Sequence, residues 1–193
     1  MTSLDQGSEP RAKVRTARLE GGRVVAPRTF FALIADEVAR AWRYDRRLSV
    51  ALARIDPMNR PGHPGAVLSA SEIEITLLDH LATDLRAPDK IALIGSGELG
   101  LLFPEATERH VRNAAQRLCS RVAETLFRVR DLTFQATLSI GTASLNHRVR
   151  SAEQLMMAAR QERRRAYSQG GNGVSSAVPI RAQSGHVRSA EMH

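Results

Sequence analysis

Two arginines and an aspartate have side chains whose chemistry could bind a phosphorylated or planar polar ligand. Arg86 and Asp89 enclose two residues in Arg86-Ala-Pro-Asp89, and Arg117 follows thirty-one residues later. A guanidinium can donate two parallel hydrogen bonds to a phosphate or to the edge of a base, and its flat face can stack on rings. The alternative is a surface ion pair worth about 0–1 kcal/mol, with Arg117 a solvated helix residue.

A glycine-containing loop is the second group of residues that could do chemistry. Gly95, Ser96, Gly97, Glu98 and Leu99 join two short apolar runs. Apolar runs on either side of such a loop predict a β-hairpin. Its glycines would let the backbone approach a phosphate, or they would serve only to make a tight turn.

The elements that must position these residues follow from periodicity. A helix is predicted from residue 27, with Phe31, Ile34 and Val38 on its buried face and Trp42 in the core. The alternation of residues 48–55 predicts a strand. Ser69 and Glu72 form a capping-box pattern for a helix that runs to about Arg86.

Later segments continue the same order. Residues 90–103 predict the hairpin, and the next helix has Val111, Ala115, Leu118 and Val122 on one face. Residues 132–143 are rich in β-formers. A second capping-box pattern at Ser151 begins a last helix, which the glycines near 170 end. The series of helices and strands, with one hairpin, predicts an α/β sandwich with a mixed, mostly antiparallel sheet flanked by helices.

Composition limits the class of protein. Hydrophobic residues make up 42% and charged residues 25%, which is typical of a soluble globular protein. We expect a flexible segment at 1–26, a domain at 27–174 and a disordered tail at 175–193. No apolar run is long enough for a membrane span, and the single cysteine fits a cytoplasmic setting. The formal net charge of +8 favours anionic partners.

Five strings in this order resemble the GGDEF family of diguanylate cyclases. They are Arg54-Ile-Asp56, Arg86-Ala-Pro-Asp89, the loop at 95–99, Ser139-Ile-Gly-Thr-Ala143 and Tyr167-Ser-Gln-Gly-Gly-Asn-Gly-Val174. The resemblance implies the family's nucleotidyl-cyclase-like α/β fold. It also allows the residues of the family's catalytic and ligand sites to be matched one by one.

The residues matched to the catalytic site have the wrong chemistry. The family's first metal-binding aspartate corresponds to Arg54, and the metal-binding carboxylate of its loop corresponds to Gly97. The residues that read guanine correspond to Gly62 and Ser71, and a lysine that holds phosphates corresponds to Tyr167. We therefore expect a degenerate domain that is not an enzyme, with no metal and no cofactor.

The residues matched to the family's inhibitory site are present. The resemblance implies that Arg86, Asp89 and Arg117 bind cyclic di-GMP through the Arg-x-x-Asp motif. The first hypothesis is a cytoplasmic, catalytically inactive cyclic di-GMP receptor in bacterial second-messenger signalling, whose output a separate protein partner carries.

Other hypotheses remain. The second is a nucleotide-independent interaction scaffold on a degenerate GGDEF fold. Membrane insertion is not expected, and nucleic-acid binding is disfavoured because aromatic residues do not alternate with the arginines. An active cyclase would need metal chemistry without its carboxylates, and homodimerisation is left open.

Overall fold

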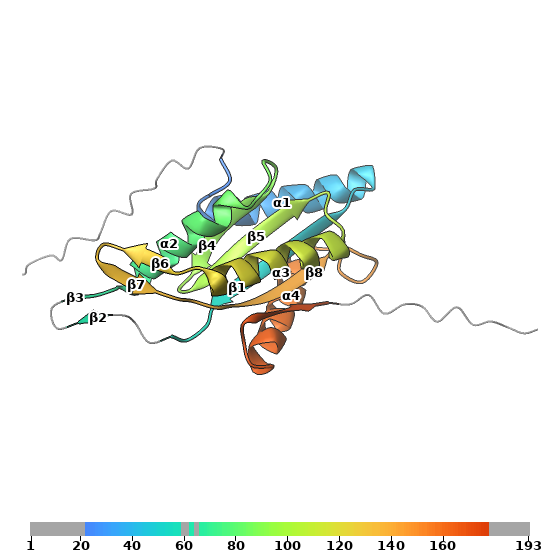
Figure 1. Cartoon of the computed structure of the whole chain (residues 1–193). Coiled ribbons are helices and arrows are strands. Elements are labelled where there is room, and N and C mark those ends of the chain that lie inside the picture. Colours follow the sequence, from blue (N-terminus) through green and yellow to red (C-terminus); the bar gives the residue numbers. More distant parts are fainter. Residues whose placement is uncertain (1–21, 59–61, 64–65, 178–193) are drawn as a thin grey trace, which may run out of the picture.

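The computed structural model describes residues 22–58, 62–63 and 66–177 of the 193-residue chain. These residues form a five-stranded sheet, four helices and two short hairpins (Figure 1). The helices are α1 (Pro27–Tyr44), α2 (Ala70–Thr83), α3 (Glu108–Glu124) and α4 (Ala152–Ser168). The sheet strands are β1 (Leu48–Ile55), β4 (Lys90–Gly95), β5 (Glu98–Pro104), β8 (Leu138–Ser144) and β9 (Gly173–Ser176). The hairpins are β2 (Gly62–His63) with β3 (Ala66–Val67), and β6 (Phe127–Val129) with β7 (Leu132–Phe134).

The strand order of the sheet is β4-β5-β1-β8-β9. The pairs β4–β5, β5–β1 and β1–β8 are antiparallel, whereas β9 lies parallel to β8. The antiparallel β4–β5 pair needs only a tight turn, while the parallel β8–β9 pair needs the crossover that α4 supplies. The predicted mixed, mostly antiparallel sheet flanked by helices is confirmed.

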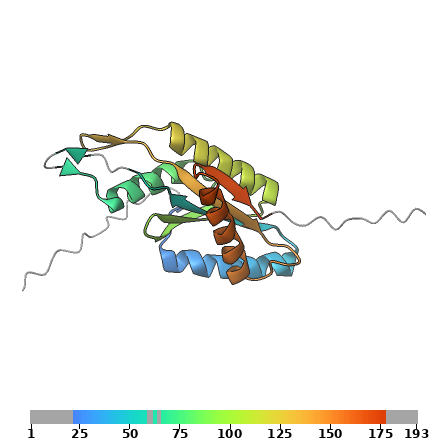
Figure 2. The ribbon, with the colours of Figure 1, turned by 90° about the horizontal axis from the view of Figure 1, so that it is seen from below.

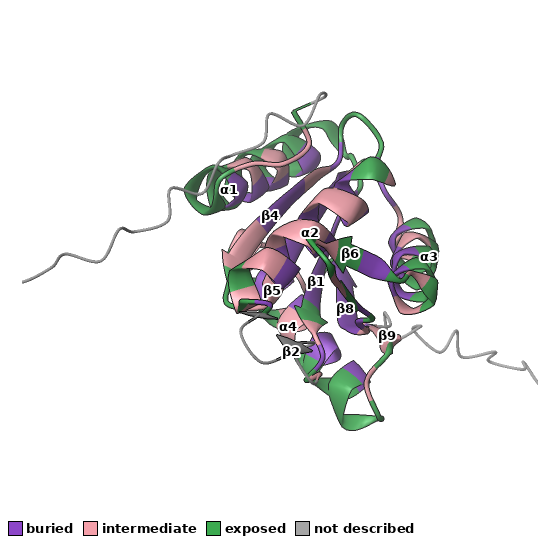
Figure 3. Cartoon of the chain, turned by 60° about the vertical axis from the view of Figure 1, so that its left-hand side comes forward, coloured by how far each residue is buried: buried purple, intermediate pink, exposed green. Residues whose placement is uncertain are grey.

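Helices cover both faces of the sheet. α2 and α3 pack on one face, and α1 and α4 pack on the other (Figure 2). Ala51 and Ala53 of β1 face the first pair of helices, and Val50 and Leu52 face the second pair. This alternation follows from the pleat of a strand. The three central strands β5, β1 and β8 are therefore mostly buried, whereas the outer sides of α1 and α3 are exposed (Figure 3).

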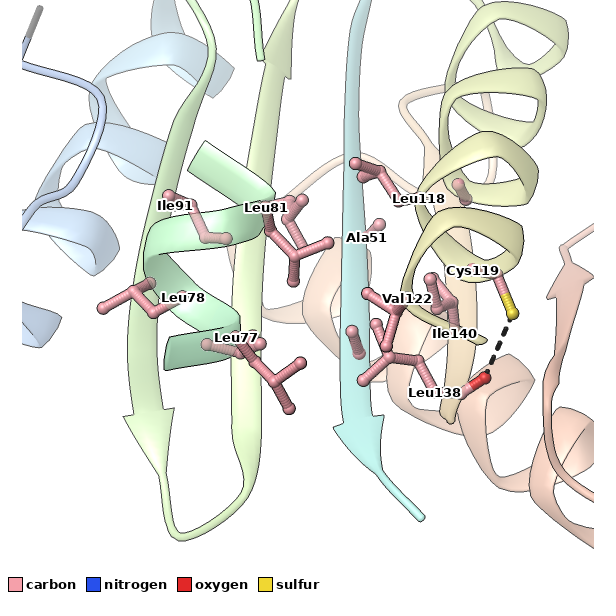
Figure 4. Packing of buried hydrophobic residues seen from close by; sticks show 14 of the residues in the cluster. Ala51, Leu77, Leu78, Leu81, Ile91, Leu118, Cys119, Val122, Leu138 and Ile140 are labelled. Atoms are coloured by element: carbon pink, nitrogen blue, oxygen red, sulfur yellow. Dashed lines mark hydrogen bonds between the residues drawn. The ribbon is translucent and has the colours of Figure 1, made fainter. Parts of the chain in front are cut away.

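The core beneath α2 and α3 contains the chain's single cysteine. The predicted apolar face of α3 is buried there and comprises Val111, Ala115, Leu118 and Val122. Cys119 lies beside this face, and its thiol donates to the Leu138 carbonyl oxygen at 3.3 Å (Figure 4). Burial, and to a lesser degree the charge of Asp56, raises the pKa of Cys119 to about 11. The thiol is therefore protonated at neutral pH.

α1 turns a different face to the core from the one predicted. Its buried residues are Phe30, Ile34, Val38 and Ala41. Phe31 and Trp42 are each 46% exposed, so their prediction as core residues is wrong. Phe30 and Phe31 both have helical spacing to Ile34, and local periodicity cannot choose between them. The choice comes from Gly100, where a Cβ atom would lie only 2.5 Å from the Phe30 ring.

Other local features differ from the prediction. α2 begins with the expected capping box of Ser69 and Glu72, but it ends at Thr83 rather than near Arg86. The predicted β-rich run is divided between β7 and β8, and the hairpin of β6 and β7 was not predicted. Ser151 caps α4 as expected. The Gln154 side chain accepts from the amide of Arg150 instead of the amide of Ser151, so the capping box is incomplete.

The ends of the domain extend into both segments that were expected to lack structure. Val24 forms a parallel bridge with Ile91, and the amide of Val25 donates to the Ile91 carbonyl at 2.9 Å. β9 continues to Ser176, and the amide of Ala177 donates to the Thr142 carbonyl. The segments expected at 1–26 and 175–193 are therefore ordered at 22–26 and 175–177, and the rest of each lies outside the described residues.

Candidate functional site

The Arg-x-x-Asp motif forms a turn between α2 and β4. The amide of Asp89 donates to the Arg86 carbonyl at 3.1 Å, which closes the four-residue turn. Because α2 ends earlier than predicted, the motif belongs to this turn and not to the last turn of the helix. The next residue, Lys90, begins β4, so the turn is anchored to the sheet on its C-terminal side.

Within this turn the two motif side chains bind each other. Arg86 Nη2 donates to Asp89 Oδ1 at 2.9 Å, and Arg86 Nε donates to Asp89 Oδ2 at 3.2 Å. The backbone amide of Arg86 donates to the same Oδ2 at 2.9 Å. The Asp89 side chain is only 3% exposed, whereas that of Arg86 is 59% exposed. The hydrogen bond with Asp89 raises the pKa of Arg86 above its ordinary value.

This geometry separates the roles of the two residues. A buried carboxylate with three donors differs from the exposed pairs that contribute almost nothing to stability. Asp89 orients the guanidinium of Arg86 and leaves its outer edge open. In this arrangement Asp89 would act on a ligand mainly by orienting Arg86, because its carboxylate is buried and already accepts three hydrogen bonds.

Arg117 completes a cavity beside the turn. Arg86, Asp89 and Arg117 all line one space of about 220 Å³, together with Phe103 of β5 and His110 of α3. Arg117 is exposed, and it lies one helical turn before Arg121, which pairs with Asp84 at the cavity's edge. The three residues singled out from the sequence are therefore brought together by two separate parts of the fold.

The glycine loop makes the turn of the β4–β5 hairpin. Gly97 has a φ of +66°, a left-handed conformation that favours glycine, and its carbonyl accepts from the amide of Ile55 at 2.9 Å. Glu74 of α2 accepts from the Gly97 amide at 2.6 Å and from Ser96 Oγ at 3.4 Å. Glu74 was not identified from the sequence, although a carboxylate beside Ile73 on a buried helix face is a signal for a partner.

The carboxylate of Glu98 lies near two arginines of α4. Arg163 Nε lies 3.4 Å from Glu98 Oε1, and Arg160 Nε lies 3.8 Å from it. Arg163 is buried, which lowers its pKa from the ordinary value, and the charge of Glu98 opposes this effect. Glu162 is also buried. Glu162 and Arg163 are therefore buried although they begin the highly charged run at 162–165, whose last two residues are exposed.

Close packing of α4 on the sheet produces this burial. At Gly141 of β8, a Cβ atom would fall on the backbone of Ala159 and Arg163. The glycine of the Ser139-Ile-Gly string therefore lets α4 lie directly against the strand. This contact brings Arg163 down to the sheet, where it meets Glu98.

Asp56 is the second carboxylate near the loop, and its hydrogen bonds hold parts of the fold together. Its oxygens accept from Thr137 Oγ1 at 2.7 Å, from Ser139 Oγ at 2.6 Å and from the amide of Asn172 at 2.9 Å. These bonds tie the end of β1 to β8 and to the loop after α4. Arg54, two residues earlier, is exposed and pairs across the sheet with Glu98 in the β1–β5 register.

The other positions matched to the catalytic site come from four elements, and Ala70, next to Ser71, lines one cavity with Arg54 and Gly97. Gly62 lies in β2, Ser71 lies in the first turn of α2, and Leu99 is buried in β5. Ser71 Oγ is 3.1 Å from Ser69 Oγ, within the helix cap. Tyr167 is exposed near the end of α4.

In the part of the chain that the structure describes, no helix combines the length and apolar character that crossing a membrane requires. No group of three or more histidine, cysteine, aspartate or glutamate side chains is arranged to hold a metal ion among residues 22–58, 62–63 and 66–177.

The sheet order, the helices on both faces and the hairpin loop define a domain of the diguanylate cyclase type. The sequence model of the family described as "Diguanylate cyclase, GGDEF domain" matches residues 28–173. The chain belongs to the GGDEF family. No curated protein matches the sequence.

Solved GGDEF structures share the fold at low sequence identity. The active GGEEF domain of a diguanylate cyclase from Vibrio cholerae superposes with a TM-score of 0.68 at 19% identity, covering 79% of this chain and 96% of that one. The GGDEF domain of PA1120 (YfiN or TpbB) from Pseudomonas aeruginosa gives 0.70 at 19% identity, with 80% and 97% covered. The GGDEF domain of DgcB from Caulobacter crescentus, in complex with c-di-GMP, gives 0.64 at 16% identity, with 79% and 91% covered.

Proposed function

We propose that this GGDEF protein is a catalytically inactive cytoplasmic receptor for cyclic di-GMP in bacterial second-messenger signalling. The observation that carries the proposal is the single cavity lined by Arg86, Asp89 and Arg117. The ligand binds there, and a separate protein partner carries the output. A ligand of this kind acts by favouring the conformation that it binds better.

The chemistry of the cavity suits guanine and phosphate. The open edge of Arg86 can donate to guanine O6 and N7 or to a phosphate oxygen, and Arg117 offers a second cation from α3. The volume of about 220 Å³ is below the roughly 300–1,000 Å³ of typical ligand pockets. The cavity therefore takes one part of the dinucleotide, and the remainder lies along the exposed arginines.

Related structures support this ligand. The GGDEF domain of DgcB was solved in complex with c-di-GMP, and another structure is described as a novel interaction mode between a microbial GGDEF domain and the same dinucleotide. These relatives are 16% and 18% identical to this chain. We propose the same ligand for this chain because the Arg86, Asp89 and Arg117 side chains can bind guanine and phosphate.

The side chains near the hairpin loop argue against cyclase chemistry. Joining two GTP molecules needs carboxylate-bound divalent metals that neutralise phosphate charge. Arg54 and Gly97 stand at the two positions where the family has metal ligands. Glu98 is paired with arginines, and Asp56 already accepts three hydrogen bonds. The residues present do not fit the metals.

The loop backbone is also engaged. A glycine loop binds phosphate through free amide groups. The Gly97 amide is 2.6 Å from a Glu74 oxygen, so a phosphate there would have to displace a carboxylate and then lie beside its negative charge. This contact supports a structural role for the loop.

Thermal unfolding with added ligand tests the proposal. At a ligand concentration about 100 times the dissociation constant, binding stabilises the folded state by about 2.7 kcal/mol, a rise of roughly 5–10 °C for a domain of this size. Cyclic di-GMP is expected to produce this rise in the native protein and in Arg112→Ala, a control on the same helix as Arg117. Arg86→Ala and Arg117→Ala are expected to lose it. Absence of a rise in the native protein would contradict the receptor and favour the nucleotide-independent scaffold.

A further inference from the structure

An apolar groove lies between α1 and α4, on the face of the sheet opposite the arginine cavity. It has a volume of about 420 Å³ and is lined mainly by Phe31, Ile34, Met156 and Met157. Phe31 is 46% exposed and Met157 is 67% exposed. Large apolar side chains gathered at an open groove mark a surface that another molecule covers.

Opposite charges flank the apolar centre of this groove. Glu153 precedes Met157 by about one helical turn, and Arg160 follows it by about one turn; both charged residues line the groove. Seven residues of helix span roughly 10 Å. The midpoint between Glu153 and Arg160 falls at Met156 and Met157, so the negative and positive ends of the stripe are equally distant from its centre.

Such a stripe is complementary to itself. We propose that a second copy of this chain covers the groove, with the two α4 helices antiparallel about a two-fold axis beside Met157. This pairing places Glu153 of each copy opposite Arg160 of the other and buries Met157 and Phe31 between them. An interface made twice by the same patch is the arrangement that a two-fold homodimer requires.

The contacts within one chain leave both charges available. Glu153 is exposed and takes part in none of the ion pairs found among the described residues. Arg160 is 43% exposed, and its Nε lies 3.8 Å from Glu98, a loose contact. A guanidinium has five N–H donors, so Arg160 can bind a carboxylate of the second copy while remaining near Glu98.

The test is the molar mass measured by light scattering during size-exclusion chromatography, without added nucleotide. The native chain is expected to have the mass of two chains at tens of micromolar. Glu153→Arg, Arg160→Glu and Met157→Glu are each expected to give the mass of one chain. The double variant Glu153→Arg/Arg160→Glu is expected to recover the dimer, because the swapped charges again face each other.

Controls separate this dimer from misfolding and from ligand binding. Arg112→Glu reverses a charge on α3, on the other face of the sheet, and Arg86→Ala alters the arginine cavity; both are expected to remain dimeric. Glu153→Arg leaves the contact of Arg160 with Glu98 intact, so it decides the matter if Arg160→Glu unfolds. A monomeric native chain, dimeric single variants or a monomeric double variant that is folded by circular dichroism would overturn the proposal.

Discussion

The guanidinium of Arg86 and the carboxylate of Asp89 form a two-pronged ion pair, with Nη2 to Oδ1 at 2.9 Å and Nε to Oδ2 at 3.2 Å. The pair is asymmetric because Asp89 is buried and Arg86 is largely exposed. Removing Arg86 would therefore leave a buried carboxylate, whereas removing Asp89 would leave a largely exposed guanidinium. Substitutions at the two positions are expected to differ in both stability and ligand binding.

Removing the arginine is expected to cost more stability than neutralising the aspartate. Arg86→Ala leaves a buried carboxylate with only a backbone donor, which we expect to cost about 3 kcal/mol. Asp89→Asn keeps the shape and one acceptor, and the exposed guanidinium is hydrated, so about 1–2 kcal/mol is expected. Urea denaturation measures both. Equal costs would show that the burial of Asp89 has no energetic consequence.

Asp89→Asn is nevertheless expected to weaken cyclic di-GMP binding about tenfold, or about 1.4 kcal/mol. The reason is that Arg86 loses the charge-assisted bonds that hold its fork in one orientation, although the arginine itself is unchanged. Asp131→Asn, an exposed aspartate outside the cavity, is the matched control. An unaltered affinity in Asp89→Asn would contradict a positioning role for Asp89.

Gly141→Ala is expected to destabilise the protein by about 3 kcal/mol or more, because the added methyl group overlaps the α4 backbone. Gly173→Ala is the control, since its Cβ would lie 3.4 Å from the nearest atom, a carbonyl oxygen of Gly171. Chemical denaturation is expected to give a cost below about 1 kcal/mol for the control. Similar costs at both positions would mean that α4 does not rest directly on Gly141.

Asp56 is expected to act in stability and not in metal binding. Asp56→Ala leaves Thr137, Ser139 and the Asn172 amide without their acceptor, with an expected cost of about 3 kcal/mol. Mg²⁺ is expected to leave the melting temperature of the native protein unchanged, since a site that does not bind the ion gains nothing from it. A rise with Mg²⁺ that Asp56→Ala abolishes would assign the carboxylate to a metal.

Much of the fold was predictable because it depends on local patterns. The strand at residues 48–55 has the predicted bounds, and the Ser69 capping box forms as expected. The elements that were predicted also occur in the predicted order, although β2, β3, β6 and β9 were not among them. These features depend on alternation and on neighbours three or four residues away, which the sequence displays directly.

Features set by distant partners were not predictable. The burial of Phe30 in place of Phe31 depends on Gly100, seventy residues further along the chain. The burial of Arg163 depends on Gly141, and the contact between Glu74 and the hairpin loop depends on how α2 lies over the sheet. The three-residue strands β6 and β7 are too short for a periodic signal.

The residues of the candidate site were predictable, whereas their geometry was not. Its residues were identified because the Arg-x-x-Asp string and Arg117 match a family pattern at fixed positions. The turn that holds Arg86 and the three hydrogen bonds that Asp89 accepts were not visible, since both depend on where α2 ends and on which side chain the turn buries.

The most direct test of the central claim is titration calorimetry of the native protein with cyclic di-GMP. We predict saturable binding with a dissociation constant in the low micromolar range or tighter, about −8 kcal/mol or better. The same protein incubated with GTP and Mg²⁺ before the titration is expected to have formed no cyclic di-GMP. Absence of heat at ligand concentrations far above the micromolar range, together with an unchanged melting temperature, would contradict the receptor.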